Sequence, residues 1–322
     1  MWGVSKAKVV EKPKNNNVLY GKDGYIFLQN DKNQTQEQIS GRLKLSGRDL
    51  RAWSTLFDLR KSWFKDRSIG YHYMAAPCKE CVYEDSLPEG LSVSAERPIR
   101  QLIDFLGKHD IFDIVYPLDA LKDAARVKAT YSKGDTHWNY YGGFVAYVEL
   151  MRSINRSRAS SGLDELKILG EAEIDFYDEV VESDLSIKIG FTDLVTQGKI
   201  RNPGARLVEK NEVPNIGGYR VFENKNSALP RAVLFRDSFS NYTVRYLAES
   251  FSRLVVVWQP NIDYSIIKKE NPDIVISQQA ERFMVVVPDE LGGATNRGYV
   301  GGKVDKGLIT AEQARVVKLA AA

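Results

Sequence analysis

The sequence predicts an α/β protein built on a mainly parallel sheet with helices on both of its faces. Short apolar runs, typical of buried strands, alternate along the chain with segments whose apolar residues recur at helical spacing. This alternation favours parallel βαβ units arranged in layers. The 322 residues are enough to bury a full core, and a composition of 43% hydrophobic and 27% charged residues is ordinary for a globular protein.

The strands are predicted from short apolar runs bounded by turn-forming residues. In chain order they cover residues 25–28, 69–77, 111–116, 218–222, 232–235, 254–258 and 273–276. The first follows the turn formers Gly21, Asp23 and Gly24, and the second ends at Pro77, which has no N–H to give to a sheet. The stretch 156–228 is polar and turn-rich, so we expect only short strands there.

The helices are predicted from apolar residues that recur every three or four positions. In chain order they cover residues 46–67, 98–106, 118–125, 140–154, 241–251, a short segment around Ile266, and 311–322. Ser46 and Thr310 are suited to cap the first and the last of these helices. Pro98 fits the first turn of its helix, and Gly107 ends it.

Charge and hydropathy exclude some classes of partner. The formal net charge is +3, and no block of Lys and Arg is present, so we expect no nucleic-acid partner. No window reaches the ~18 apolar residues of a membrane helix, so we expect no integral membrane segment. The N-terminus has no apolar core of a signal peptide, which predicts a cytoplasmic protein as encoded.

A serine stands where a predicted strand meets a predicted helix. The strand 232–235 runs into Arg236, Asp237 and Ser238, and a helix begins soon after. A serine at such a turn lies at the carboxyl edge of the sheet, and backbone N–H groups at a helix start favour developing negative charge. This is the logic of a nucleophile elbow, although the G-x-S-x-G pattern is absent. The alternative is that Ser238 only caps the helix.

A second feature places Asp135 and His137 two residues apart, just before the helix over 140–154. In extended backbone these side chains project to one side, so the carboxylate can accept from one imidazole nitrogen while the other takes a proton from serine. The alternatives are a loop histidine with Asp135 as a helix-entry cap, or a metal role, for which no third ligand is visible. Together with Ser238 the pair predicts a nucleophile, a base and an orienting acid, with no metal and no cofactor.

Five stretches of the chain resemble the AlgX/AlgJ family of SGNH-hydrolase-like proteins, the alginate and exopolysaccharide O-acetyltransferases. In the family's order they are GKDGYIFL, AAPCKECVYEDSLP, DTHWNYYGG, ALPRAVLFRDSFSNYTVRYLAESF and NPDIVISQQAERF, which cover about residues 19–285. The resemblance implies a three-layer α/β/α SGNH-type fold with short additional β elements. It also implies that Asp135 and His137 match the family's catalytic Asp-x-His and that Ser238 matches its serine. Because family members tend to be exported, it adds a periplasmic location as an alternative.

Composition and the resemblance together divide the chain into three parts. Residues 1–18 are expected to be a flexible arm, 19–290 an SGNH-like catalytic domain with an irregular, β-rich insert at 156–228, and 291–322 a tail with a short helix.

Several further residues are expected near the substrate. Asn241 could hold an oxyanion, and Arg236 could fix its turn or contact an anionic substrate. Gln278 and Arg282 follow the strand 273–276 and are expected at the same sheet edge. Trp138 could stack on a sugar, although an aromatic residue beside a helix start more often packs internally.

The predicted function is O-acetyl transfer to a polysaccharide or glycan through an acyl-serine. The alternatives are a carbohydrate esterase or deacetylase with the same three residues, and a non-catalytic glycan-binding scaffold. The expected partners are a glycan acceptor and an acyl donor, which a membrane acyltransferase could present. Cys78 and Cys81 form a C-x-x-C pair, which is compatible with a redox or zinc site but is interpreted as two incidental loop thiols.

Overall fold

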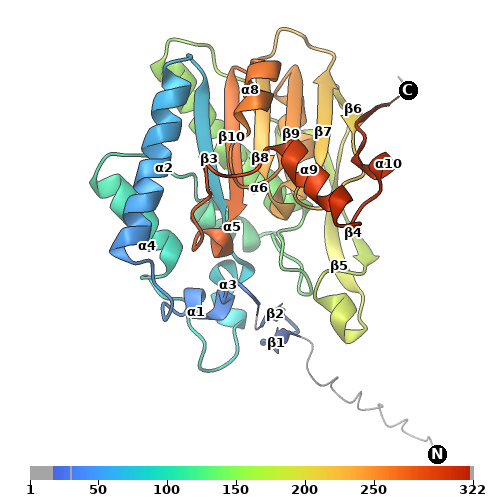
Figure 1. Cartoon of the computed structure of the whole chain (residues 1–322). Helices are drawn as coiled ribbons and strands as arrows, with labels where there is room; N and C mark the ends of the chain where they lie inside the picture. Colours follow the sequence, from blue (N-terminus) through green and yellow to red (C-terminus); the bar gives the residue numbers. More distant parts are fainter. Residues whose placement is uncertain (1–16, 30, 320–322) are drawn as a thin grey trace, which may run out of the picture.

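A computed structural model describes residues 17–29 and 31–319 (Figure 1). Most of the predicted arm, residues 1–16, and the last three residues of the predicted C-terminal helix lie outside the described residues.

The centre of the molecule is a mixed seven-stranded sheet in the order β11-β6-β7-β9-β8-β10-β3. Its strands are β3 (Gly70–Ala76), β6 (Ala205–Lys210), β7 (Tyr219–Asn224), β8 (Arg231–Arg236), β9 (Arg253–Trp258), β10 (Ile274–Ala280) and β11 (Val317–Lys318). The neighbours β3, β10, β8 and β9 run parallel, whereas β7, β6 and β11 are added by antiparallel pairing. The parallel strands therefore bring several carboxyl ends to one edge.

Helices cover both faces of the sheet, which confirms the predicted three-layer α/β/α fold. They are α1 (Thr35–Ile39), α2 (Gly47–Lys65), α3 (Lys79–Val82), α4 (Pro98–Lys108), α5 (Leu118–Ala125), α6 (Tyr140–Ser160), α7 (Val244–Glu249), α8 (Tyr264–Glu270), α9 (Asn296–Asp305) and α10 (Ala311–Ala314). Alternate residues of β8 show the two layers: Leu234 packs with α6 and α7, and Val233 with α2 and α8. None of the helices within the described residues is long and apolar enough to cross a bilayer.

Two small hairpins lie outside the central sheet. β1 (Val18–Tyr20) pairs with β2 (Ile26–Leu28), and β4 (Ile174–Val181) pairs with β5 (Asp193–Ile200). Both hairpins lie toward the lower end of the molecule in Figure 1, where α3 and α5 also lie. The irregular stretch 156–228 thus contributes both the β4–β5 hairpin and two strands of the central sheet, β6 and β7.

Several element predictions are corrected by the structure. Of residues 111–116 only Val115 pairs with the sheet, by one parallel bridge to Met74 beyond the edge of β3. The predicted helix 241–251 is divided into a 3₁₀ helix, η4 (Ser238–Tyr242), and the short α7.

At the C-terminus, Thr310 does form a capping box, but its helix ends at Ala314 because the chain then turns into β11. The preceding helix α9 was not predicted, since its three glycines have low helix propensity.

Candidate active site

Ser238 lies at the turn where β8 becomes η4, and Asp237 fixes that turn. The Asp237 carboxylate accepts the N–H of Phe239 at 3.0 Å, the Nε2 of Gln278 at 3.1 Å and the N–H of Ala280 at 2.6 Å. It thereby ties the end of β8 to the end of β10. Burial raises the pKa of Asp237 although these hydrogen bonds oppose the shift. Ser238 itself is half-buried at the carboxyl edge of the sheet.

The histidine segment is held against this turn by close backbone packing. Asn139 caps α6 by accepting the N–H of Gly142 at 2.9 Å, and its Nδ2 donates to the carbonyl of Ala129 at 2.7 Å. A Cβ at Gly143 would lie 2.6 Å from the carbonyl oxygen of Tyr242, so this position needs glycine. The start of α6 therefore approaches η4 directly.

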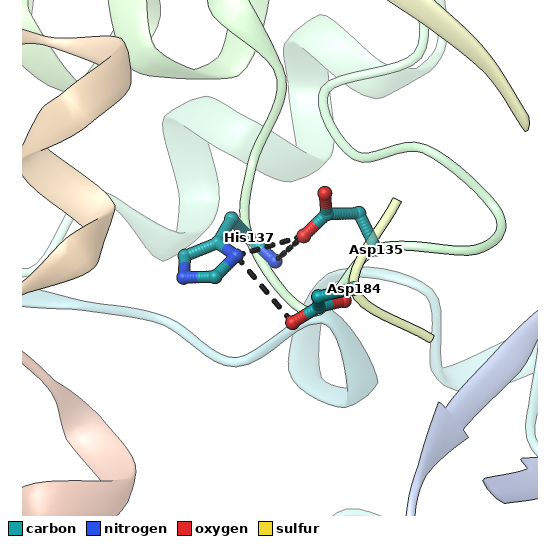
Figure 2. A group of neighbouring side chains, drawn as sticks. All are labelled: Asp135, His137 and Asp184. Carbon is teal, nitrogen blue, oxygen red and sulfur yellow. Dashed lines mark hydrogen bonds and ion pairs between the residues drawn. The ribbon is translucent and has the colours of Figure 1, made fainter. Parts of the chain in front are cut away.

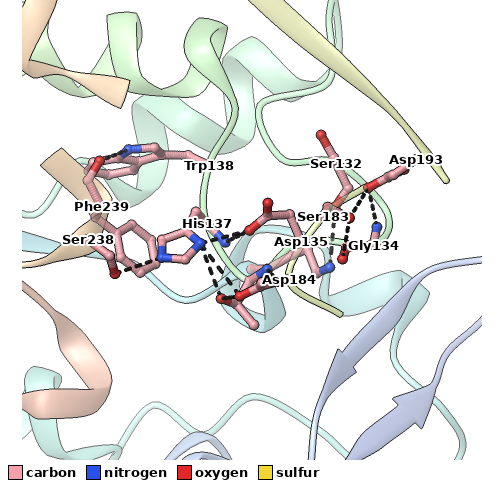
Figure 3. A network of polar contacts seen from close by, with 12 residues as sticks. Ser132, Gly134, Asp135, His137, Trp138, Ser183, Asp184, Asp193, Ser238 and Phe239 are labelled. Carbon is pink, nitrogen blue, oxygen red and sulfur yellow. Dashed lines mark hydrogen bonds and ion pairs between the residues drawn. The ribbon is translucent and has the colours of Figure 1, made fainter. Parts of the chain in front are cut away.

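A continuous chain of hydrogen bonds joins Asp135, His137 and Ser238 (Figure 3). His137 Nε2 lies 2.7 Å from Ser238 Oγ, and His137 Nδ1 lies 2.8 Å from Asp135 Oδ1. The same carboxylate oxygen accepts the backbone N–H of His137 at 2.8 Å. In the tautomer that satisfies both ring contacts, Nδ1 donates to Asp135 and Nε2 accepts from the serine hydroxyl. The structure thus brings together the three side chains that the sequence singled out.

The electrostatic environment favours an ionised Asp135. Burial raises the pKa of this carboxyl, but the hydrogen bonds and the charge of His137 outweigh it, and the pKa falls below its ordinary value. The aromatic rings of Phe239 and Tyr242 flank the imidazole, with centroids 4.8 and 5.8 Å away. A charged acceptor behind a partly enclosed imidazole can hold the tautomer that a general base needs.

Trp138 packs internally, which was the alternative to its stacking on a sugar. Its side chain is 0% exposed, and its indole Nε1 donates to the carbonyl of Phe239 at 2.9 Å. The indole also packs edge-on against the Phe239 ring. Because Trp138 follows the histidine and Phe239 follows the serine, this bond links the two segments that carry them.

Gln278 and Arg282 lie at the expected edge of the sheet, but both side chains are buried, and the near-complete burial of Gln278 corrects the prediction that it faces the substrate. Gln278 bonds to Asp237 and to the hydroxyl of Ser240, so it fixes the turn from within. The guanidinium of Arg282 lies 5.2 Å from the centroid of the Phe239 ring, behind the nucleophile turn. The alternation of strands and helices predicted that these residues lie at the sheet edge. It could not predict whether their side chains point inward or outward.

Arg236 fixes its turn, which is the first of the two roles considered for it. Its Nη1 donates to the carbonyl of Asp237 at 2.9 Å, and its guanidinium lies 3.9 Å from the centroid of Trp258. Burial, with the charge of Arg220 added, lowers the pKa of Arg236 to about 9, against the opposing effect of Asp237. Arg236 also lines a cavity of about 290 Å³, whose wall includes Asp237, Trp258 and Phe283.

Asn241 is exposed in η4. Side chains three residues apart eclipse each other in a 3₁₀ helix, so Asn241 projects on the same side as Ser238.

The comparisons with known proteins identify the family. The family model described as "SGNH hydrolase-like domain, acetyltransferase AlgX" matches residues 18–257. The chain belongs to this AlgX family of SGNH hydrolase-like proteins. No curated protein sequence matches it.

Solved structures share the AlgX-type fold at low sequence identity. Bacillus cereus PatB1 superposes with a TM-score of 0.59 at 16% identity, covering 83% of this chain and 96% of that one. The same protein has also been solved with a sulfonyl adduct. The O-acetyltransferase domain of Pseudomonas putida AlgJ gives 0.53 at 14% identity, over 86% and 96% of the two chains. Pseudomonas aeruginosa AlgX gives 0.51 at 15% identity, over 84% of this chain and 63% of that one.

The structure adds one residue to this site that the sequence did not reveal. Asp184, in the connection between β4 and β5, places Oδ2 3.6 Å from His137 Nδ1 (Figure 2). It lies in the stretch 156–228, which is predicted to be an irregular insert, and no spacing in the sequence links it to Asp135 or His137. Only a contact in the folded structure could find it.

The same cluster is where a metal ion would find ligands. Ligand atoms of Asp135, His137 and Asp184 lie within 4.8 Å of one another. However, the Nδ1 that would bind a metal already donates to Asp135 when Nε2 accepts from Ser238. The arrangement therefore fits an imidazole base better than a metal ligand.

The two cysteines lie near this site but are not loop thiols, which corrects that interpretation. Cys78 is at the N-cap position of α3 without a capping bond from its side chain, Cys81 lies within the helix, and both are free and buried. Cys81 Sγ donates to Glu281 Oε1 at 3.0 Å. Burial raises the pKa of both thiols well above the ordinary value, which disfavours the thiolate form.

Proposed function

We propose that this protein is an O-acetyltransferase that acts on a polysaccharide or glycan through an acyl-serine intermediate. One observation carries the proposal: the Asp135–His137–Ser238 chain of hydrogen bonds ends on a half-buried serine at the carboxyl edge of the sheet. Membership of the AlgX family supports acetyl transfer as the reaction class.

The proposed reaction has two halves. As Ser238 Oγ attacks the carbonyl carbon of the acyl donor, His137 Nε2 takes the hydroxyl proton and then gives it to the departing group. The product of this half is an acetyl ester on Ser238. In the second half His137 takes the proton of a sugar hydroxyl, the sugar oxygen attacks the ester, and the proton returns to Ser238 Oγ as the serine leaves.

Asp135 and the start of η4 stabilise the positive and negative charges that develop in each step. Asp135 stabilises the imidazolium that forms on His137 and keeps Nε2 directed at Ser238. The backbone N–H of Ser238 is at the first position of η4, where helical N–H groups have no partner within the helix. We assign this N–H and the side chain of Asn241 as donors to the tetrahedral oxyanion, where one donor contributes roughly 10²–10³ in rate.

The cavity next to the turn is the proposed place for the substrate. It has about 290 Å³ and is lined by aromatic rings of Trp258 and Phe283. Ser238 and His137 are not part of its wall, which reaches the site through Asp237, the residue directly before the nucleophile. Small-molecule sites combine such apolar walls with a few polar groups, which here include Arg236.

The test is the mass of the intact protein after incubation with p-nitrophenyl acetate. We expect one acetyl adduct on the unmodified protein and none on Ser238→Ala. Ser252→Ala is the matched control, because Ser252 is half-buried like Ser238 but lies just before β9, at the opposite end of the parallel strands, and this variant should keep the adduct.

Adding an oligosaccharide acceptor should then discharge the adduct and acetylate the sugar. Discharge to free acetate alone would contradict transfer and favour an esterase. An unmodified protein, or an adduct that survives Ser238→Ala, would contradict the acyl-serine mechanism.

A further inference from the structure

The connection between β4 and β5 brings a second carboxylate to the imidazole of His137. Asp184 Oδ2 lies 3.6 Å from Nδ1, compared with 2.8 Å for Asp135 Oδ1 (Figure 2). The Asp184 side chain is 38% exposed and that of Asp135 is 11% exposed. The imidazole therefore faces one enclosed acid and one acid that is open to solvent.

Asp184 is held in this place by the residue between the other two. The backbone N–H of Thr136 donates to Asp184 Oδ1 at 2.8 Å, and the Thr136 hydroxyl donates to Oδ2. Both oxygens of the carboxylate are thus oriented by the segment that carries the histidine. A freely rotating surface carboxylate would have no such pair of donors.

The β4–β5 connection is itself fixed on Gly134, one residue before Asp135 (Figure 3). The Gly134 carbonyl accepts from Ser183 Oγ at 2.7 Å and from the N–H of Ser186 at 3.0 Å, and the Gly134 N–H donates to Asp193 at 2.7 Å. A Cβ at position 134 would lie 2.8 Å from that of Ser186, so only glycine admits this contact. The placement of Asp184 is therefore built into the backbone.

The pKa values of the two carboxyls beside His137 are shifted in opposite directions. Burial and the charge of Asp135 raise the pKa of Asp184, against the effects of His137 and Thr136. The pKa of Asp135 is lowered, because its bonds to His137 outweigh its burial. On acidification Asp184 therefore loses its charge before Asp135 does.

We propose that Asp184 is a positioning residue of the active site, whose carboxylate places a second negative charge beside the imidazolium that forms on His137 during acyl transfer. The inference rests on the proposed function. An anion this close to a forming cation stabilises it, by an amount that the exposure of Asp184 reduces. The role differs from that of Asp135, which accepts the hydrogen bond of the Nδ1–H directly.

The other ionisable groups around His137 are still present in a variant that replaces Asp184 alone. They are Asp135 on the same segment, Asp237 and Tyr242 after β8, Lys79 on α3, and Arg282 after β10. A change in pH dependence on replacing Asp184 alone is therefore attributable to that one charge.

The test compares Asp184→Asn with Asp178→Asn in the acetyl-transfer assay. The asparagine Oδ1 can still accept the backbone N–H of Thr136, and its Nδ2 can donate to the Thr136 hydroxyl in place of the bond that this hydroxyl gave to the carboxylate, so the side chain can keep its place while its charge is removed. Asp178 is the matched control, since it lies on the same hairpin and accepts from the Thr196 hydroxyl at 2.7 Å, away from His137. We expect kcat of Asp184→Asn to fall about tenfold with KM unchanged, and the acid limb of the rate profile to move to lower pH. Asp178→Asn should match the unmodified protein.

Ser238→Ala, measured in the same assay, distinguishes a failure of the role of Asp184 from a failure of the proposed acyl-serine function. If Ser238→Ala is inactive and Asp184→Asn has the kcat and pH profile of the unmodified protein, the role of Asp184 is overturned while the acyl-serine mechanism stands. If Ser238→Ala remains active, the proposed function itself has failed. A loss of activity in Asp184→Ala that is absent from Asp184→Asn would also overturn the proposal, because it would show that Asp184 only supports the local structure.

Discussion

Replacing Trp138 by phenylalanine separates the internal role seen in the structure from the sugar contact that its position suggested. The substitution removes the indole N–H and leaves the buried carbonyl of Phe239 without its donor at 2.9 Å. An unsatisfied buried polar group costs about 1–3 kcal/mol. Because Trp138 is 0% exposed, the smaller ring also leaves a buried cavity. The two effects together bring the expected loss of stability to ~2–4 kcal/mol.

The kinetics of Trp138→Phe should show that the indole positions the catalytic residues and does not bind the substrate. The lost bond joins the segment of His137 to the segment of Ser238, so their alignment loosens and kcat should fall. KM should change little, because the indole has no surface for a substrate to contact. A sugar-stacking tryptophan would give the opposite result, with raised KM and unchanged stability.

The assay is urea unfolding followed by circular dichroism, together with steady-state kinetics of acetyl transfer. Trp63→Phe serves as the control, since Trp63 is only half-buried in α2 and its ring packs against Phe64 and Tyr264. Its loss of stability should stay below that of Trp138→Phe. A Trp138→Phe variant that unfolds at the same urea concentration as the unmodified protein would refute the reasoning.

Two further outcomes follow from buried ionisable groups near the site. Lys79 donates to the carbonyl of Lys133 at 2.8 Å, and burial lowers its pKa from an ordinary 10.5 to about 8. The unfolded chain holds this proton to higher pH than the folded protein, so the free energy of unfolding should rise between pH 7 and pH 10 by ~2–3 kcal/mol more than in Lys79→Met; parallel curves for the two proteins would contradict this. The thiols of Cys78 and Cys81 should react with iodoacetamide at pH 8 about 100-fold more slowly in the folded protein than in urea, because burial disfavours their thiolates. Equal rates in the two conditions would show that these thiols are accessible.

The sequence was informative where a feature is local. Asp135 and His137 are two residues apart, and Ser238 follows an apolar strand, so each could be singled out from its neighbours. That the three side chains form one site was predicted from their complementary chemistry and from the resemblance to the AlgX/AlgJ family, and the structure brings them together. The cap at Ser46 was equally local, and it forms the predicted bond to the first turn of α2.

Predictions that depended on which way a side chain faces were less successful. Trp138 and Gln278 lie beside the site in sequence and in space, but both point inward, where their polar atoms fix the turn after β8. Asp184 could not be found at all, because its approach to His137 depends on the folding of the β4–β5 connection onto Gly134. Contacts between distant segments of irregular chain leave no periodic signal in a single sequence.

The central claim is that His137 activates Ser238, and the most direct measurement is the rate at which a sulfonyl fluoride modifies that serine. Peptide mapping by mass spectrometry should place the adduct on Ser238, and His137→Ala should slow its formation by about 10²–10⁴, the usual contribution of a general base. Modification of Ser238 at an unchanged rate in His137→Ala, or an adduct on another residue, would contradict the account.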